Sequence, residues 1–172
     1  MALRSDWSGM ACPIARSLDV VGDPWLMLIL RYSLMGVRRY DDYRRSLGIA
    51  DNILSKRLAT MVDAGLLTKA PYKEQGRTRY EYVLTEAGAE LLPVVHALLL
   101  WGEKHTTSPQ TAPLQIRHDP CGRVSSSADR CDGCGEPLTP ESVTWVRSGR
   151  EGRVTPLAAP AQHAKSEDHE PA

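Results

Sequence analysis

Three cysteines and a histidine lie close together in the last third of the sequence. The segment contains His118-Asp-Pro-Cys121-Gly and, further on, Cys131-Asp-Gly-Cys134-Gly, which gives the spacing H-x2-C-x9-C-x2-C. These side chains offer four nitrogen and sulfur ligands, and the glycine after each pair lets the backbone turn tightly around a metal. The pattern predicts a closed tetrahedral site for one structural Zn²⁺, with no position left open for catalysis.

A metal-free reading of the same segment is the alternative, with reduced thiols and His118 as a surface residue. The short β-like pieces at 114–117 and 143–147 bury little apolar area alone, and modules of this size usually need a staple such as a metal. The N-terminus, MALRSDWSGMACP, has no apolar signal region, so we expect a cytoplasmic protein with reduced cysteines.

The remaining cysteine, Cys12, precedes Pro13 at the start of a predicted helix. Amides at a helix N-terminus stabilise a thiolate, and Arg16 follows one turn later. A thiolate at this place would react with oxidants or electrophiles. The alternative is an inert, half-buried thiol at a dimer interface.

Charge is unevenly distributed along a chain whose formal net charge is zero. Residues 31–80 contain 11 basic and 5 acidic side chains, a local balance of +6. Such a segment can bind a polyanion although the whole chain is neutral. The longest apolar run, Trp25 to Leu30, is far shorter than the roughly 20 residues that span a bilayer, so we expect no membrane partner.

The order of predicted elements in residues 1 to about 107 is four helices, a β-hairpin and a last helix. The helices are expected at about 13–21, 24–36, 40–47 and 51–64, with Asp51 able to cap the fourth. The hairpin comprises 66–72 and 79–84, and one long helix runs from Glu86 to about His105, capped by Thr85. This order predicts a mainly α winged helix-turn-helix fold with a small β-hairpin wing.

The fourth helix has the two faces expected of a recognition helix. Leu54, Leu58 and Met61 form its apolar stripe. The opposite face carries polar or small side chains that can reach base edges, namely Asn52, Ser55, Lys56 and Ala59. Basic side chains on both sides of this helix are candidates for phosphate contacts, namely Arg38, Arg39, Lys73, Arg77 and Arg79. The alternative is a solvated helix face on a winged-helix adaptor that binds proteins.

Several motifs in 12–104 resemble those of the HxlR-type winged-helix transcriptional regulators. They are, in order, the Cys-Pro start, GDPW, RRYDDYRRSLGI, ILSKRL, DAGLL, EYVLTEAG and a last helix that ends in Trp-Gly. The loop KEQGRTR departs from the family by lacking a proline at the wing. The resemblance implies a homodimeric regulator that binds double-stranded DNA, and some members sense oxidants or electrophiles through a cysteine near the N-terminus.

A dimer is also suggested by two apolar flanks, around 10–13 and 91–101, which one small domain cannot easily bury. His96, in the second flank, is expected at an interface. No nucleophile elbow, phosphate-binding glycine loop or defensible carboxylate pair is present, so we expect no enzyme. The inducing signal, a small molecule or a redox change, cannot be deduced.

The chain thus divides into three predicted segments. Residues 1–107 form the DNA-binding and dimerisation domain, and 108–147 form a small β-rich module that resembles a zinc ribbon. Residues 148–172 lack periodicity and are expected to be a disordered tail.

Overall fold

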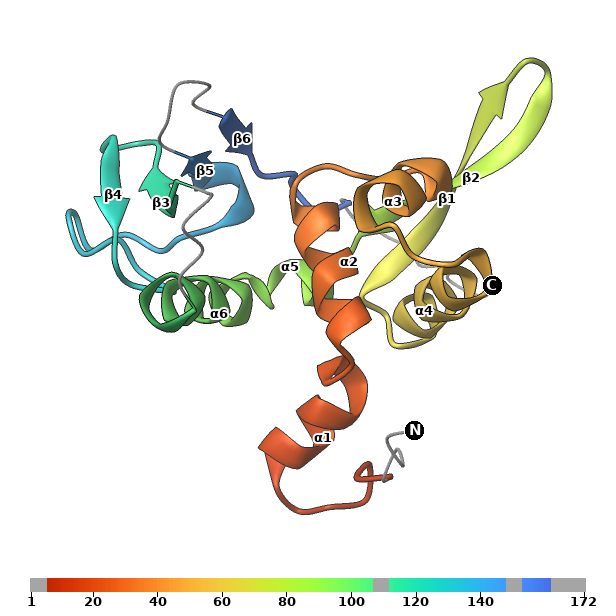
Figure 1. Ribbon diagram of the computed structural model, residues 1–172, viewed down its shortest axis with the longest axis horizontal. Coiled ribbons are helices and arrows are strands. Elements are labelled where there is room, and N and C mark those ends of the chain that lie inside the picture. The colour runs from red at the N-terminus through yellow and green to blue at the C-terminus, as the bar shows by residue number, and fades with distance from the viewer. Residues whose placement is uncertain (1–5, 107–111, 148–152, 162–172) are drawn as a thin grey trace, which may run out of the picture.

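The computed structural model describes residues 6–106, 112–147 and 153–161 and shows a helical body with a β-hairpin on one side and a second, four-stranded sheet on the other (Figure 1). The helices are α1 Pro13–Val21, α2 Pro24–Leu34, α3 Tyr40–Leu47, α4 Asp51–Asp63, α5 Glu86–Ala89 and α6 Leu92–His105, with a 3₁₀ turn at Pro140–Ser142. The strands are β1 Leu67–Glu74, β2 Arg77–Leu84, β3 Leu114–His118, β4 Arg123–Ser125, β5 Val143–Arg147 and β6 Arg153–Pro156. The predicted winged helix-turn-helix with a β-rich appendage is confirmed.

Local signals explain most helix ends. The Asp23 carboxylate accepts the backbone N–H of Trp25 and caps α2, and Gly48 ends α3 in a left-handed conformation. The expected cap of α4 is wrong, because Ala50 occupies the cap position and Asp51 is already helical. The Asp51 carboxylate instead lies 2.9 Å from Arg44 Nε, where its charge still favours the positive end of the helix.

The single long helix expected from Glu86 to His105 is also wrong, because the structure divides it into α5 and α6. Thr85 caps α5 as predicted, since its hydroxyl accepts the N–H of Gly88. The break follows from Pro93 in the first turn of α6. Proline has no N–H to donate and its ring clashes with the carbonyl four residues earlier, so a helix cannot continue through it unbroken.

The helical core lies between α2, α3 and α4. Leu54, Leu58 and Met61 are fully buried, as the apolar stripe predicted. The Tyr43 hydroxyl lies 2.8 Å from Ser33 Oγ and donates to the carbonyl of Val37. Burial raises the pKa of Tyr43 to about 12, so this hydroxyl stays neutral and fixes α3 against α2.

The second sheet is antiparallel, with strand order β4-β3-β5-β6. Its last strand contradicts the expected disordered tail, because β6 pairs with β5 and Leu157 is buried. The N–H groups of Ala158 and Ala161 then donate to the carbonyls of Leu34 and Leu84, at 2.7 and 2.8 Å. The preceding strand and the distant residues Leu34 and Leu84 hold this segment through its backbone, so a pattern of side chains does not indicate it. Residues 148–152 and 162–172 of the expected tail, and 107–111 of the expected linker, lie outside the described residues.

Buried residues of the two parts form one continuous core that includes Ile116 and Trp145 of the second sheet. His96 of α6 lies within this core and is fully buried, so the expectation of a dimer-interface residue is wrong. Trp145 Nε1 donates to His96 Nε2 at 3.0 Å, and His96 Nδ1 lies 2.9 Å from the carbonyl oxygen of Ala128. The second sheet is therefore joined to α6 by a buried hydrogen-bonded chain.

Candidate nucleic-acid interface and metal cluster

The α4 helix presents a polar face to solvent. Asn52, Ser55, Lys56 and Ala59 are all exposed, while the apolar stripe opposite them is buried. The short connection 48–50 brings α3 against α4, so the two helices form a helix-turn-helix. The four candidate base-contacting side chains therefore share one accessible surface.

Ser55 also has a partner inside the chain. The Tyr40 hydroxyl donates to the carbonyl of Asp51 at 2.9 Å and lies 3.0 Å from Ser55 Oγ. These bonds join the start of α3 to the first turns of α4. Ser55 thus helps to hold α4, the predicted recognition helix, in place, a role that its spacing in the sequence does not reveal.

The β1–β2 hairpin projects from the body beside α3 and α4 (Figure 1). Gln75 and Gly76 form its tip, both with positive φ, which the twist of a tight hairpin turn requires. Lys73 Nζ donates to Thr78 Oγ1 at 2.8 Å across the two strands. Lys73 and Arg77 are both exposed near the tip, where a wing contacts phosphate groups.

Carboxylates pair with the other candidate phosphate-binding arginines. Glu74 accepts from both Arg39 and Arg79, at 3.3 and 3.0 Å, and Arg38 lies 3.6 Å from Glu81. Sequence reasoning missed the acidic partner of Arg39 and Arg79. The expected hairpin could have indicated that Glu74 and Arg79 are neighbours on adjacent strands. It could not have indicated Arg39, which lies just before α3.

Arg57 is not part of this candidate DNA-binding surface. Its Nη2 lies 2.6 Å from Asp23 Oδ2, so it joins α4 to the cap of α2. The local excess of positive charge counted along the sequence therefore overstates what is free to meet a polyanion.

The four residues of the predicted metal site are brought together. His118 Nδ1 lies 3.2 Å from Cys121 Sγ and 3.3 Å from Cys134 Sγ, and the sulfurs of Cys121 and Cys131 are 3.6 Å apart. All four ligand atoms lie within 4.8 Å of one another. A tetrahedral zinc ion with Zn–S bonds of about 2.3 Å requires sulfur atoms about 3.8 Å apart, so the cluster has nearly the required size.

Two similar turns supply these ligands. The N–H of Gly122 donates to the carbonyl of His118 at 2.8 Å, and the N–H of Gly135 donates to that of Cys131 at 2.7 Å. Both glycines have positive φ, 69° and 82°. The sequence prediction that a glycine after each pair allows a tight turn is confirmed, and the two turns face one another across the cluster.

The surroundings of the Cys131 thiol favour its deprotonated form. Burial raises its pKa, but hydrogen bonds from the amides of Gly133 and Cys134, and from the neighbouring thiols, outweigh this effect and lower the pKa overall. Thiolates are the form of cysteine that binds metals. His118 is also buried, which contradicts the alternative of a surface residue.

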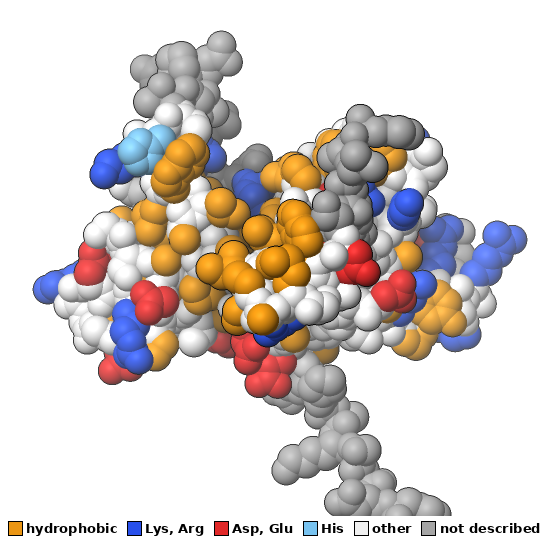
Figure 2. Space-filling view, turned by 90° about the horizontal axis from the view of Figure 1, so that it is seen from below, with side chains coloured by type: hydrophobic (Ala, Val, Ile, Leu, Met, Phe, Trp, Pro, Cys, Tyr) orange, Lys and Arg blue, Asp and Glu red, His pale blue; other side chains and the backbone are white. Residues whose placement is uncertain are grey.

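Cys12 occupies the N-cap position of α1 and is exposed. Arg16 lies close by, but its guanidinium donates to the carbonyls of Met10 and Ala11, at 2.7 and 2.9 Å. The α1 helix has no buried residue, and Ile14 is 72% exposed. Figure 2 shows the face from which α1 projects, with hydrophobic side chains gathered near its middle.

Comparison with known proteins decides the family, because the sequence model of the HxlR-like helix-turn-helix family matches residues 20–110 of this chain. The chain belongs to this family. Rv3095 of Mycobacterium tuberculosis, an uncharacterised HTH-type transcriptional regulator, is 39% identical to this HxlR-like protein over 131 residues, 76% of this chain and 82% of the relative. YdeP of Bacillus subtilis, named likewise, is 32% identical over 95 residues, 55% and 73% of the two chains.

Solved structures show the same likeness. PA1607, a candidate transcription factor, is 33% identical with a TM-score of 0.64, over 86% of this chain and 100% of the other. The redox regulator HypR in its oxidized form is 28% identical with a TM-score of 0.52, over 56% and 100%. The HxlR-like protein is thus a winged-helix transcriptional regulator and not an enzyme. Within the described residues, no helix is long and apolar enough to cross a membrane.

Proposed function

We propose that the protein is a homodimeric regulator that reads specific DNA sequences with α4 and holds the DNA backbone with the β1–β2 hairpin. The observation that carries this proposal is the exposed polar face of α4, with Asn52 and Lys56, beside the exposed cations of the hairpin. Amide and ammonium groups at the start of a recognition helix can bond to base edges in the major groove. Lys73 and Arg77 supply the sequence-independent contacts.

The α1 helix supports the dimer. Ile14, Leu18 and Met10 are exposed by 72, 48 and 48%, and Trp101 of α6 is exposed by 59%. A helix of nine residues is marginal in water unless it packs against a partner. A second copy that covers α1 and α6 would bury these side chains and place two recognition helices about 34 Å apart, or at a multiple of that distance.

Selection of bound sequences from random duplex DNA tests the proposal. Fluorescence anisotropy at a fixed salt concentration then compares the selected sequence with a scrambled one. We expect the selected duplex to bind at least about a thousandfold more tightly, with two chains per duplex. Equal affinity for both duplexes would favour the alternative, a winged-helix adaptor that binds proteins.

The Cys and His cluster holds one structural Zn²⁺ in this proposal. The sulfur and nitrogen distances and the two matching glycine turns support it. Zinc fits better than harder ions, since three thiolates and one imidazole favour a soft tetrahedral metal. The ion would join the β3–β4 turn to the 131–135 turn at the edge of the continuous core.

Metal analysis of protein purified without chelators tests the zinc site. We expect about one zinc ion per chain, with Cys131→Ser removing it and Cys12→Ser, the matched control, retaining it. DNA affinity should change far less than zinc content, because the cluster lies on the opposite side of the body from α4 (Figure 1). Zinc content near zero in the parent would leave a metal-free module.

Cys12 is the proposed sensor of oxidants or electrophiles. Its exposure, its place at a helix N-terminus and the likeness to HypR, a redox regulator, support this role. Peroxide would convert its thiolate to a sulfenic acid. Mass spectrometry after brief peroxide treatment should find Cys12 modified before the other cysteines, and DNA affinity should change in the parent but not in Cys12→Ser. Unmodified Cys12 would indicate an inert thiol.

A further inference from the structure

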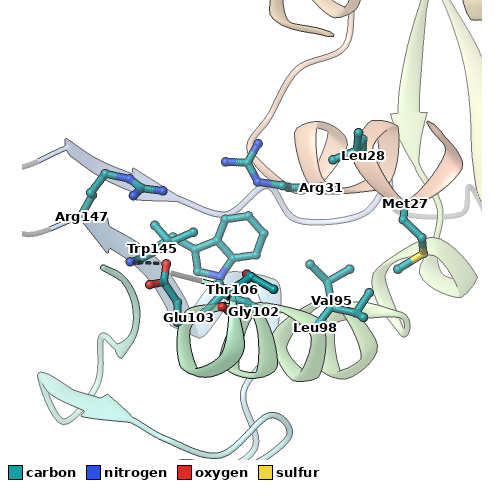
Figure 3. Close-up of a pocket in the computed structure, with 12 residues that line it drawn as sticks. Met27, Leu28, Arg31, Val95, Leu98, Gly102, Glu103, Thr106, Trp145 and Arg147 are labelled. Atoms are coloured by element: carbon teal, nitrogen blue, oxygen red, sulfur yellow. Dashed lines mark hydrogen bonds between the residues drawn. The ribbon is translucent and has the colours of Figure 1, made fainter. Parts of the chain in front are cut away.

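A cavity of about 510 Å³ opens between α2, α6 and the second sheet (Figure 3). Its volume lies within the range of small-molecule sites in proteins, about 300–1,000 Å³. Neither the DNA surface nor the metal cluster contributes to its walls. The cavity therefore needs an explanation of its own.

Apolar side chains form most of its interior. Met27 enters from α2, Val95 lines the α6 side, and the Trp145 indole closes the end formed by β5 (Figure 3). Leu99 of α6 also lines the cavity. Leu98 of α6 stands at the mouth and is 54% exposed in the single chain, before any second copy covers α6. Such walls accept an aromatic or branched aliphatic group, because transfer of apolar surface from water is favourable.

The charged groups of the cavity favour an anion. Arg31 of α2 and Arg147 of β5 both line it, together with Glu103 of α6. The Glu103 carboxylate already accepts the N–H of Leu114 at 2.9 Å. No carboxylate in the described part of the chain forms a salt bridge with either arginine. Arg147 donates one bond to the carbonyl of Ala112, and the Arg31 guanidinium lies 4.9 Å above the Tyr32 ring.

The wall opposite α2 is held rigidly. Trp145 Nε1 donates to His96 Nε2 in the core, so the indole is fixed in position before any ligand arrives. Trp145 and His96 are both almost fully buried. Because this wall is already ordered, a ligand that binds there pays a smaller cost in conformational entropy.

We propose that this cavity binds an amphipathic organic anion, with an aromatic or branched aliphatic body and one carboxylate. The body packs between α2, α6 and Trp145. The carboxylate accepts charge-assisted bonds from Arg31 and Arg147, which are stronger than bonds between neutral groups. This proposal does not depend on the proposed DNA binding, because binding of the anion can be measured on the protein without DNA.

Calorimetry on the full chain, without DNA, tests the site with 2-naphthoate, 4-phenylbutyrate and 3-methylbutanoate and with the neutral amide of each acid. We expect at least one acid to bind saturably at one molecule per chain, and its amide to bind at least about tenfold more weakly. Arg31→Gln and Arg147→Gln should each weaken the acid by about tenfold while leaving the amide nearly unchanged.

Gly102→Leu fills the cavity without disturbing the helix. A Cβ at Gly102 meets its nearest atom, Thr106 Oγ1, at 3.6 Å, an ordinary contact, and leucine is a better helix former than glycine. This variant should lose binding while its thermal unfolding stays at or above that of the parent. Lys104→Gln removes a charge from the last turn of α6 outside the cavity and should bind like the parent. Failure of all three acids to bind, or unchanged binding in Gly102→Leu, would overturn the proposal.

Discussion

Lys56 and Asn52 lie one turn apart on the exposed face of α4, where the proposed function places contacts with base edges. Replacing either by alanine should reduce the preference for the selected DNA over scrambled DNA, because the lost bonds discriminate between bases. Each good base contact contributes about 1–3 kcal/mol, so the preference should fall between about fivefold and 150-fold. Anisotropy titrations with both duplexes measure the ratio.

Lys104→Ala is the matched control for these variants, since it removes the same charge from the last turn of α6. Its preference should equal that of the parent. If Lys56→Ala and Asn52→Ala also retain the parent preference, another face of the molecule reads the DNA.

His96 makes stability depend on pH in the weakly acidic range. Burial lowers its pKa from 6.5, partly opposed by the bond with the Ala128 carbonyl. Trp145 can only donate, so His96 Nε2 must be unprotonated in the folded chain. As pH falls below about 6.5, the unfolded chain takes up this proton while the folded chain resists it, and the free energy of unfolding decreases.

Urea unfolding at several pH values between about 7.5 and 5.5, one unit on each side of the ordinary histidine pKa, tests this dependence. The parent should lose stability toward the acidic end. His96→Gln should be less stable than the parent at the upper end, by about 1–3 kcal/mol for the disturbed buried bonds, and should show a flatter pH profile. Parallel profiles for the two proteins would mean that other groups cause the dependence.

At the scale of elements, the hairpin carries cations whose charge is partly neutralised by Glu74. Its carboxylate pairs with Arg79 at 3.0 Å and Arg39 at 3.3 Å, both about half exposed. Glu74→Gln should free both guanidinium groups for phosphates. Affinity for all duplexes should rise by several fold, and the salt dependence of binding should steepen by about one to two phosphate contacts.

Salt titrations of the parent and Glu74→Gln measure that slope. Glu90→Gln, at the end of α5, removes an equal charge away from the hairpin and serves as the control. Arg77→Ala should change the slope in the opposite direction. An unchanged slope in Glu74→Gln would show that the hairpin does not contact phosphates.

Local sequence signals predicted the helices and strands well, but they did not predict the contacts between them. Thr85 acts at the helix end where its chemistry predicted it, and Asp23 and Gly48 act in the same local way at the ends of α2 and α3. The division of the last helix could have been found from Pro93, whose effect on a helix is local. The role of Asp51 depends on Arg44 and that of Glu74 partly on Arg39, which the packing of separate elements brings close, so no local pattern indicates these two pairs.

At the scale of the whole molecule, the metal cluster and the cavity show opposite limits of sequence reasoning. The spacing of His118 and three cysteines encodes the cluster, because short turns bring each ligand pair together. The cavity combines α2, α6 and β5, which meet only in the folded chain, and no spacing could have indicated it. The candidate DNA contacts lie between these limits, since periodicity identified the exposed face of α4 but not the bond between Ser55 and Tyr40.

The segment after β6 fastens the second sheet to the winged helix and should contribute to the stability of both. Leu157 is 8% exposed, and the N–H groups of Ala158 and Ala161 donate to carbonyls of Leu34 and Leu84. A chain that ends at Pro156 loses all three interactions, whereas a chain that ends at Ala161 keeps them. Burial of one leucine contributes about 1.5–3 kcal/mol and each hydrogen bond about 0.5–1.5 kcal/mol.

Urea unfolding, followed by tryptophan fluorescence, to which Trp145 of the second sheet contributes, and by helical circular dichroism, compares the two truncated chains with the parent. The chain ending at Ala161 should match the parent, and the chain ending at Pro156 should lose about 2.5–6 kcal/mol. Because the core is continuous, both signals should report one shared transition in the parent. Equal stability of the two truncated chains would show that this strap does not hold the two parts together, and separate transitions would show that they unfold independently.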